Sequence, residues 1–113
     1  MSLLVSLMDF DTKDRESVDK WAFSNGDDHA NIHQSIQSQS LGNLFVYQLY
    51  PINLPRWDSF AQQHQNAHNE VNEALGLAGT DLTGVDFNDP AKAAEWSMAH
   101  YTEHRAWHAK LGI

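Results

Sequence analysis

The sequence predicts a mainly α-helical fold, a compact bundle of about four helices with a short extended N-terminal arm and one short strand-like segment. Three observations favour it. A chain of 113 residues can bury one modest core and hardly two. Apolar residues recur at steps of three and four over long stretches, which is the period of a helix. Pairs of histidines at four-residue spacing lie inside these stripes, and the chain holds seven histidines in all.

We expect a single domain over residues 1–113 with four parts. These are an N-terminal arm (1–10), a helical part (11–43), an extended part (44–52) and a pair of histidine-bearing helices (53–113).

The first expected helix begins at Asp11 or Thr12, either of which can accept hydrogen bonds as a cap. It is expected to run to about Ser24, because Asn25-Gly26 is a dipeptide typical of turns.

A second helix is then expected from Asp27-Asp28, whose acidic side chains suit the positive end of a helix. Its inward face would carry His29, Ile32, His33, Ile36 and Ser40, and Leu41-Gly42-Asn43 would end it.

Residues 44–52 are rich in β-branched and aromatic side chains and end near a proline, which is typical of a single strand. Pro51 would end the strand or confine it to an edge, since proline has no amide proton to donate.

Two longer helices follow. The first is expected from about Pro55 to Ala74, with Gly76 suited to the left-handed position after its end. The second opens with Asp89 as cap and Pro90 in its first turn, and it closes at Leu111-Gly112.

These two helices form an internal repeat. A shift of 36 residues places His64 on His100 and His68 on His104. Phe60 matches Trp96 in the same alignment, and a weaker copy of the pattern surrounds His29 and His33. Repeats of this length are usually helical units that bury one another's faces. Two good copies are fewer than a solenoid needs, so they favour a bundle.

Histidines spaced by four residues lie on one helix face, so packing would bring the imidazoles of His64, His68, His100 and His104 together. His29 and His33 are candidates to join them. Three interpretations stay open: buried structural imidazoles, a metal site for Zn²⁺, Ni²⁺ or Cu²⁺, and a pH-sensitive element. Under the first, the hydrogen-bond partners would come from nearby polar residues: Asn66, Asn69, Glu70, Asn72 and Glu103.

Composition excludes several functions. Seven basic against fifteen acidic residues leave a net charge of −8, which disfavours binding to nucleic acid and to anionic membrane surfaces. The absence of cysteine excludes disulfides and thiolate chemistry. Residues 2–8 are too few and too close to acidic residues for a signal or membrane-spanning segment. No motif of a zinc protease, serine hydrolase or nucleotide-binding loop occurs, so we expect no enzymatic activity.

Two apolar segments are candidates for contacts with other chains, because an arm or a strand edge can be completed by a partner. The candidate interface residues are Leu3, Leu4, Val5, Leu7, Phe45, Tyr47 and Tyr50.

Residues 55–113 resemble a group of small proteins encoded among the structural genes of tailed bacteriophages. The resemblance rests on an Asp-Phe-x-Asp-Pro stretch, a tryptophan, the HxxxH pair and a terminal Leu-Gly-Ile. The matching residues are Asp86, Phe87, Asp89, Pro90, Trp96, His100, His104, Leu111, Gly112 and Ile113.

This resemblance implies a structural or assembly component of a virion, made in the host cytoplasm and placed at the head–tail junction, in the tail or on the capsid. Its partners would be other virion proteins or further copies of itself, with several copies in the assembly. The alternative is a small helical metal-binding domain for Zn²⁺ or Ni²⁺, similar to the DinB-like group, whose members present histidines from several helices.

Overall fold

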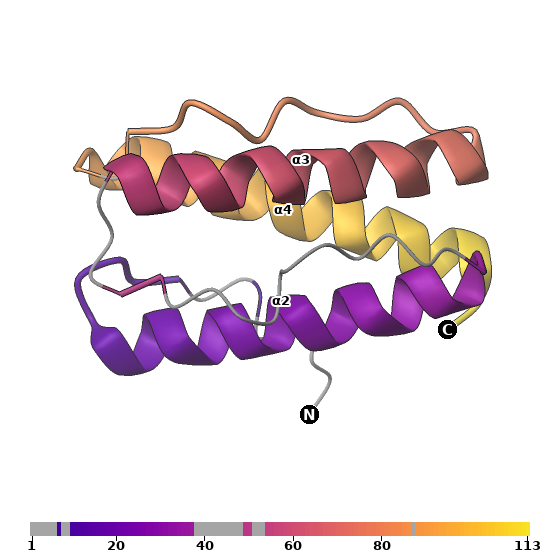
Figure 1. Cartoon of the computed structure of the whole chain (residues 1–113), viewed down its shortest axis with the longest axis horizontal. Coiled ribbons are helices and arrows are strands. Elements are labelled where there is room, and N and C mark those ends of the chain that lie inside the picture. Colours follow the sequence, from indigo (N-terminus) through magenta and orange to yellow (C-terminus); the bar gives the residue numbers. More distant parts are fainter. Residues whose placement is uncertain (1–6, 8–9, 38–48, 51–53, 87) are drawn as a thin grey trace.

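Three long helices, side by side and running in the same direction, build the computed structural model of this protein (Figure 1). They are α2 (Arg15–Ser35), α3 (Leu54–Leu75) and α4 (Pro90–Leu111). The structure describes residues 7, 10–37, 49–50, 54–86 and 88–113. Within these residues, no helix is both long enough and apolar enough to cross a membrane.

The predicted break between two helices at Asn25-Gly26 is wrong, because α2 passes through both residues without interruption. Both are buried in the bundle. The side-chain oxygen of Asn25 lies 3.3 Å from Nε2 of His64, so its amide has a partner inside the helix bundle. A tertiary contact thus offsets the local preference of Asn for a turn.

The start of α2 also differs from expectation. The N-terminal cap of α2 is Asp14, not Asp11 or Thr12 as predicted. The Asp14 carboxylate accepts a hydrogen bond from the backbone amide of Glu16 at 3.2 Å. Asp11 lies one turn earlier, where its backbone oxygen accepts from the amide of Asp14.

The predicted bounds of the other two helices are confirmed within one residue at each end. Gly76 follows α3 with φ of 68°, the left-handed value predicted for it. Asp89 caps α4 by accepting from two backbone amides, and Gly112 ends it with φ of 72°. Caps read from the sequence succeeded here because each acts on its own helix end.

The described part of the chain therefore holds three helices and no strand, against the four helices and one strand-like segment predicted. Of the predicted strand, residues 44–48 and 51–52 lie outside the described residues. Leu49 and Tyr50 are described and are not part of a strand.

The predicted N-terminal interface is only partly described. Leu7 is fully buried in the chain's own core, so its apolar side chain is not available to a partner. Its backbone oxygen also accepts a hydrogen bond from the hydroxyl of Ser97 on α4. Tyr50 is half-buried against the same core. The remaining candidates, Leu3, Leu4, Val5, Phe45 and Tyr47, lie outside the described residues.

Two apolar clusters occupy the two ends of the bundle axis. The cluster near the starts of the helices is large and aromatic: Leu7, Val18, Trp21, Leu49, Trp57, Phe60, Ala61, Ala67, Leu82 and Trp96. The cluster near their ends is smaller: Ile32, Val71 and Trp107, with Ile36, Leu75, Leu77 and Leu111 packed against it. Because the helices are parallel, each places its histidine pair at the level between these clusters.

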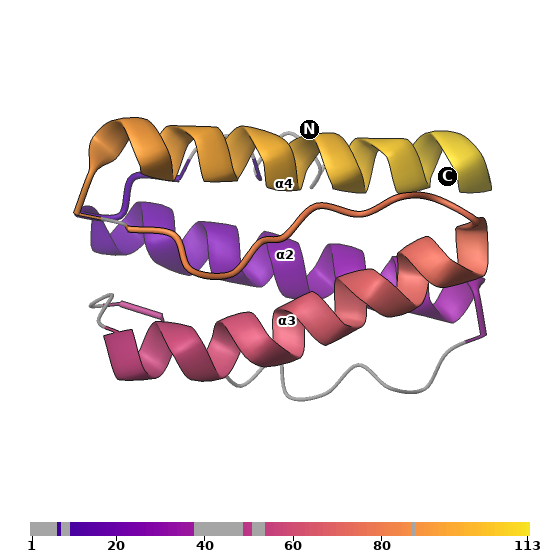
Figure 2. The ribbon, with the colours of Figure 1, turned by 90° about the horizontal axis from the view of Figure 1, so that it is seen from above.

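The connection from α3 to α4 runs back along both helices as an extended strap over residues 76–86 (Figure 2). Hydrogen bonds hold Leu82 at its middle. Its amide donates to the side chain of Gln65 at 2.7 Å, and its oxygen accepts from the indole of Trp96 at 2.8 Å. The strap therefore covers the side of the bundle where α3 meets α4.

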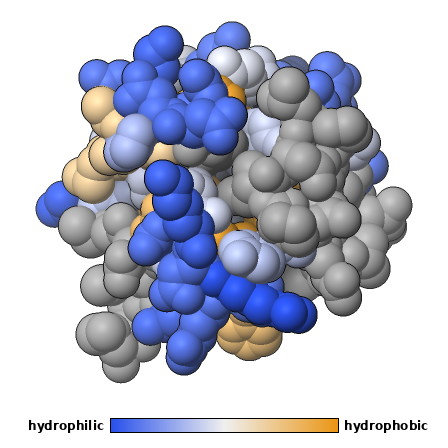
Figure 3. Space-filling view, turned by 90° about the vertical axis from the view of Figure 1, so that its left-hand side faces the viewer, coloured by the Kyte–Doolittle hydropathy of each residue, from blue (hydrophilic) through white to orange (hydrophobic). Residues whose placement is uncertain are grey.

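The end of the bundle where the three helices begin is mainly hydrophilic over its described atoms, with small apolar areas between them (Figure 3).

Candidate metal centre

Five histidines from all three helices converge in the middle of the bundle. One ring nitrogen from each lies within 4.8 Å of the others, and every one of these side chains is fully buried. They are His29 on α2, His64 and His68 on α3, and His100 and His104 on α4.

The structure brings the four predicted ligands His64, His68, His100 and His104 together and adds His29 to them. His33, the other predicted candidate, lies one ring further out, with its Nε2 3.2 Å from Nδ1 of His29. Four-residue spacing puts each pair on one face of its helix, and the parallel packing brings the three faces to the same level.

The closest approaches are between Nε2 atoms. His68 lies 3.0 Å from His64 and 3.2 Å from His29, and His64 lies 3.1 Å from His100. Nitrogens bound at ~2.1 Å to one tetrahedral ion are about 3.4 Å apart. The Nε2 pairs at 3.0, 3.1 and 3.2 Å lie within that separation, whereas the full span of 4.8 Å must contract before all five rings could reach one ion.

Carboxylates hold three of these rings from behind. Nδ1 of His68 donates to Glu103 at 2.9 Å and Nδ1 of His104 donates to Asp28 at 2.6 Å. His29 is held through His33, whose Nδ1 donates to Glu70 at 3.1 Å. Carboxylates that fix the outer nitrogen of a histidine are the usual support of metal-binding imidazoles.

Burial keeps these histidines neutral. It lowers the pKa of His29, His64, His68 and His100 well below the ordinary value, and the neighbouring imidazoles lower it further. Burial lowers the pKa of His104 as well, although the adjacent carboxylate opposes this.

The carboxylates respond differently to the same surroundings. Burial alone would raise the pKa of Asp28, but the hydrogen bonds and charges of His104 and His108 outweigh it and leave the pKa lowered. Burial raises the pKa of Glu103, opposed by hydrogen bonds from Asn72 and Thr80.

Neutral rings have one proton each, and the carboxylates determine where it sits. His68 uses its proton at Nδ1 towards Glu103, so its Nε2 is unprotonated. Burial lowers the pKa of His33, so that ring is neutral too; its proton faces Glu70, and its Nε2 accepts from Nδ1 of His29. Nε2 of His29 is then also unprotonated, and it faces the bare Nε2 of His68 at 3.2 Å.

Further nitrogens in the centre lack hydrogen-bond partners among the described residues. Nε2 of His104 is one, because its Nδ1 is taken by Asp28. The Nδ1 atoms of His64 and His100 are the others. An unpaired buried polar group costs ~1–3 kcal/mol. Nε2 of His104 thus lacks a partner within the described part of the chain, whereas the Nδ1 atoms of His64 and His100 belong to rings that approach their neighbours through Nε2.

Aromatic rings seal the centre. Trp96 stacks on His100 with ring centroids 5.1 Å apart, and Phe60 stacks on His64 at 4.8 Å. Trp107 lies 4.4 Å from His68 on the other side. These rings exclude water and lock the imidazoles in place.

Asn25 and Asp28 were not among the predicted site residues, because Asn25 was expected at a helix break and Asp28 at the start of the next helix. Asp28 accepts from His104 and, at 2.7 Å, from Nε2 of the half-buried His108. These partners are 76 and 80 residues away in the chain, so no local pattern could reveal them. Of the polar partners proposed for the histidines, Glu70 and Glu103 contact them directly.

Comparison with known proteins adds no relative. No family model, no curated protein and no solved structure matches this chain, so the likeness to phage structural proteins stays a prediction from the residues that carry it.

Proposed function

We propose that this protein binds one divalent late transition-metal ion, such as Zn²⁺, Ni²⁺ or Cu²⁺, in the centre formed by His29, His64, His68, His100 and His104. The observation that carries the proposal is the convergence of five buried ring nitrogens within 4.8 Å, among which Nε2 of His29 and Nε2 of His68 lie 3.2 Å apart. The carboxylate contacts assign both of these nitrogens as unprotonated, and a cation between two such lone pairs turns their repulsion into two bonds.

The ligand type supports this metal class. Imidazole suits Zn²⁺, Cu²⁺ and Ni²⁺, whereas Mg²⁺ and Ca²⁺ prefer oxygen ligands. The five imidazoles are neutral, so the charge of the ion would be balanced by the carboxylates behind them. The side chains of Asp28 and Glu103 are only 2% and 6% exposed, and each contacts one of the five histidines. They are therefore close enough to the centre to balance that charge.

The enclosure of the site favours a closed metal centre. Structural sites fill the coordination sphere with protein ligands, whereas hydrolytic sites keep one position open for water. Here every one of the five imidazoles is fully buried under tryptophan and phenylalanine rings. The proposed role of the ion is therefore to tie the three helices together.

The test is metal content and affinity of the purified chain after removal of adventitious ions. We expect one Zn²⁺ per chain, measured by elemental analysis and by competition with a chelating dye. Both His68→Ala and His104→Ala should lose stoichiometric binding, because each removes one of the five ligands.

His108→Ala is the matched control. His108 lies on α4 and contacts the same Asp28, but it is not one of the five converging residues. Binding of one ion should survive this change. A wild-type chain that stays metal-free at micromolar Zn²⁺, Ni²⁺ and Cu²⁺ would overturn the proposal.

A further inference from the structure

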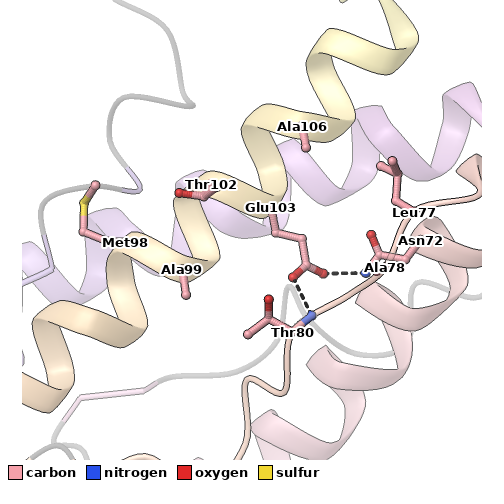
Figure 4. Close-up of a pocket in the computed structure, with 9 residues that line it drawn as sticks. All are labelled: Asn72, Leu77, Ala78, Thr80, Met98, Ala99, Thr102, Glu103 and Ala106. Carbon is pink, nitrogen blue, oxygen red and sulfur yellow. Dashed lines mark hydrogen bonds between the residues drawn. The ribbon is translucent and has the colours of Figure 1, made fainter.

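The carboxylate of Glu103 is shared by three donors. At Oε1 it accepts from Nδ1 of His68 at 2.9 Å and from the amide nitrogen of Asn72 at 2.6 Å. At Oε2 it accepts from the backbone amide of Thr80 in the strap at 3.2 Å. Figure 4 shows the carboxylate reaching from α4 towards Asn72 and Thr80 at the wall of a pocket of about 350 Å³.

The direction of this network is fixed by Trp107. An indole N–H can only donate, and that of Trp107 lies 2.8 Å from the side-chain oxygen of Asn72. The oxygen of Asn72 is therefore the acceptor, and its NH₂ group is turned to Glu103. Because that NH₂ group can only donate, Oε1 of Glu103 must accept, and the proton shared with His68 belongs to the imidazole.

We infer that Asn72 is a positioning residue of the metal centre. Clamped by Trp107, it fixes the proton of His68 on Nδ1 and so leaves Nε2 of His68 free to bind the ion. The inference deepens the proposed metal binding and rests on it for its consequence, whereas the position of the proton holds in the metal-free chain as well.

Gly79 in the strap leaves room for the side-chain amide of Asn72. A Cβ atom at this position would lie 2.5 Å from the amide nitrogen of Asn72 and 3.7 Å from Oε1 of Glu103. Among the described glycines, those with positive φ are Gly76, Gly84 and Gly112, and Gly79 is not one of them. Its lack of a side chain is therefore a matter of space, and that space is filled by the amide of Asn72.

The test compares Trp107→Phe and Asn72→Leu with the wild type. The first removes one N–H and keeps a ring; the second removes the amide and keeps the volume. In the metal-free chain, ¹H–¹⁵N correlation spectra of the imidazoles should show His68 moving from the Nδ1–H form towards the Nε2–H form. Zn²⁺ affinity should fall by about 10- to 100-fold, the usual effect of losing a residue that orients a ligand.

Trp96→Phe is the matched control. Its indole also donates one buried hydrogen bond of 2.8 Å, but to the oxygen of Leu82, and its ring stacks on His100. It should lower stability about as much as Trp107→Phe does, with the proton of His68 unchanged.

Two results would overturn the inference. One is a His68 that leaves its Nδ1–H form in Trp96→Phe as far as it does in Trp107→Phe. The other is a His68 that keeps its Nδ1–H form in the variants. If Asn72→Leu does not fold, Trp107→Phe decides alone. A wild type that binds no metal would refute the proposed function, while the spectra would still decide the role of Asn72.

Discussion

Asp28 is a buried residue whose carboxylate holds two histidines of α4 in place. Its two oxygens accept from His104 at 2.6 Å and from His108 at 2.7 Å, and its side chain is only 2% exposed. Hydrogen bonds to an ionised group are stronger than those between neutral groups. The carboxylate thus fixes which nitrogen of His104 faces the centre.

Asp28→Asn should weaken Zn²⁺ binding by about 10- to 100-fold, because an amide offers one acceptor oxygen where the carboxylate offers two. The measurement is a competition titration with a chelating dye. Asp27→Asn is the control, since it makes the same chemical change at a neighbouring, less buried position. Equal affinity in Asp28→Asn and wild type would contradict the orienting role of Asp28.

At the scale of elements, each predicted feature succeeded or failed according to the range of the interactions that determine it. The bounds of α3 and α4 depend on Pro, Asp and Gly at helix ends, which act locally, and these were predictable. The inward histidine stripes followed from four-residue spacing. The course of α2 was not predictable, because Asn25 finds its partner in His64, 39 residues away.

The candidate metal centre was also predictable only in part. That His64, His68, His100 and His104 would meet was predictable from the repeat, since equal spacing on packed helices aligns equal positions. The parallel direction of α2 was not predictable, although it is this direction that brings His29 to the level of the other four histidines. The burial of Leu7 also depends on the packing of a short apolar segment, for which the sequence offers several places.

Asp89→Ala should destabilise the fold by ~1 kcal/mol, the usual cost of losing a helix cap. Its carboxylate accepts from the amides of Ala91 at 3.0 Å and Lys92 at 3.4 Å, and both would lose this partner. Urea unfolding of the metal-free chain measures the change. Zn²⁺ affinity should stay the same, since Asp89 is far from the histidines along α4. A drop in affinity would mean that the start of α4 is coupled to the centre.

At the scale of the whole molecule, the central layer of imidazoles makes stability depend on pH. Above the ordinary histidine pKa of 6.5, the rings are neutral in the folded and the unfolded chain. Below it, the unfolded chain binds protons that His29, His64, His68 and His100 do not, because burial lowers the pKa of each. This proton binding lowers the free energy of the unfolded state, so the free energy of unfolding falls as the pH falls.

We expect the free energy of unfolding, measured with urea and a chelator, to decrease steadily from pH 6.5 to pH 5.5. Each buried histidine that stays neutral contributes a loss of up to about 1.4 kcal/mol per pH unit. Burial raises the pKa of Glu103, so protonation of this carboxylate favours the folded state at lower pH. The measurement therefore stops above the pH range in which Glu103 titrates. A flat profile would show that protons enter the folded centre freely.

The virion role stays a prediction at this scale. A subunit of a repeated assembly should self-associate or bind a neighbouring structural protein, so sedimentation of the purified chain should show species larger than 12.8 kDa. A strictly monomeric chain, alone and with the products of adjacent genes, would count against it. The metal centre does not depend on this outcome.

The common direction of α2, α3 and α4 has an electrical consequence. The peptide dipoles of parallel helices add, so one end of the molecule carries about three times the partial positive charge of a single helix, and the opposite end the matching negative charge. Acidic Glu16 lies in the first turn of α2 and basic Lys110 lies in the last turn of α4, where each opposes this polarity. A protein polarised along its axis would orient itself before it touches a charged surface.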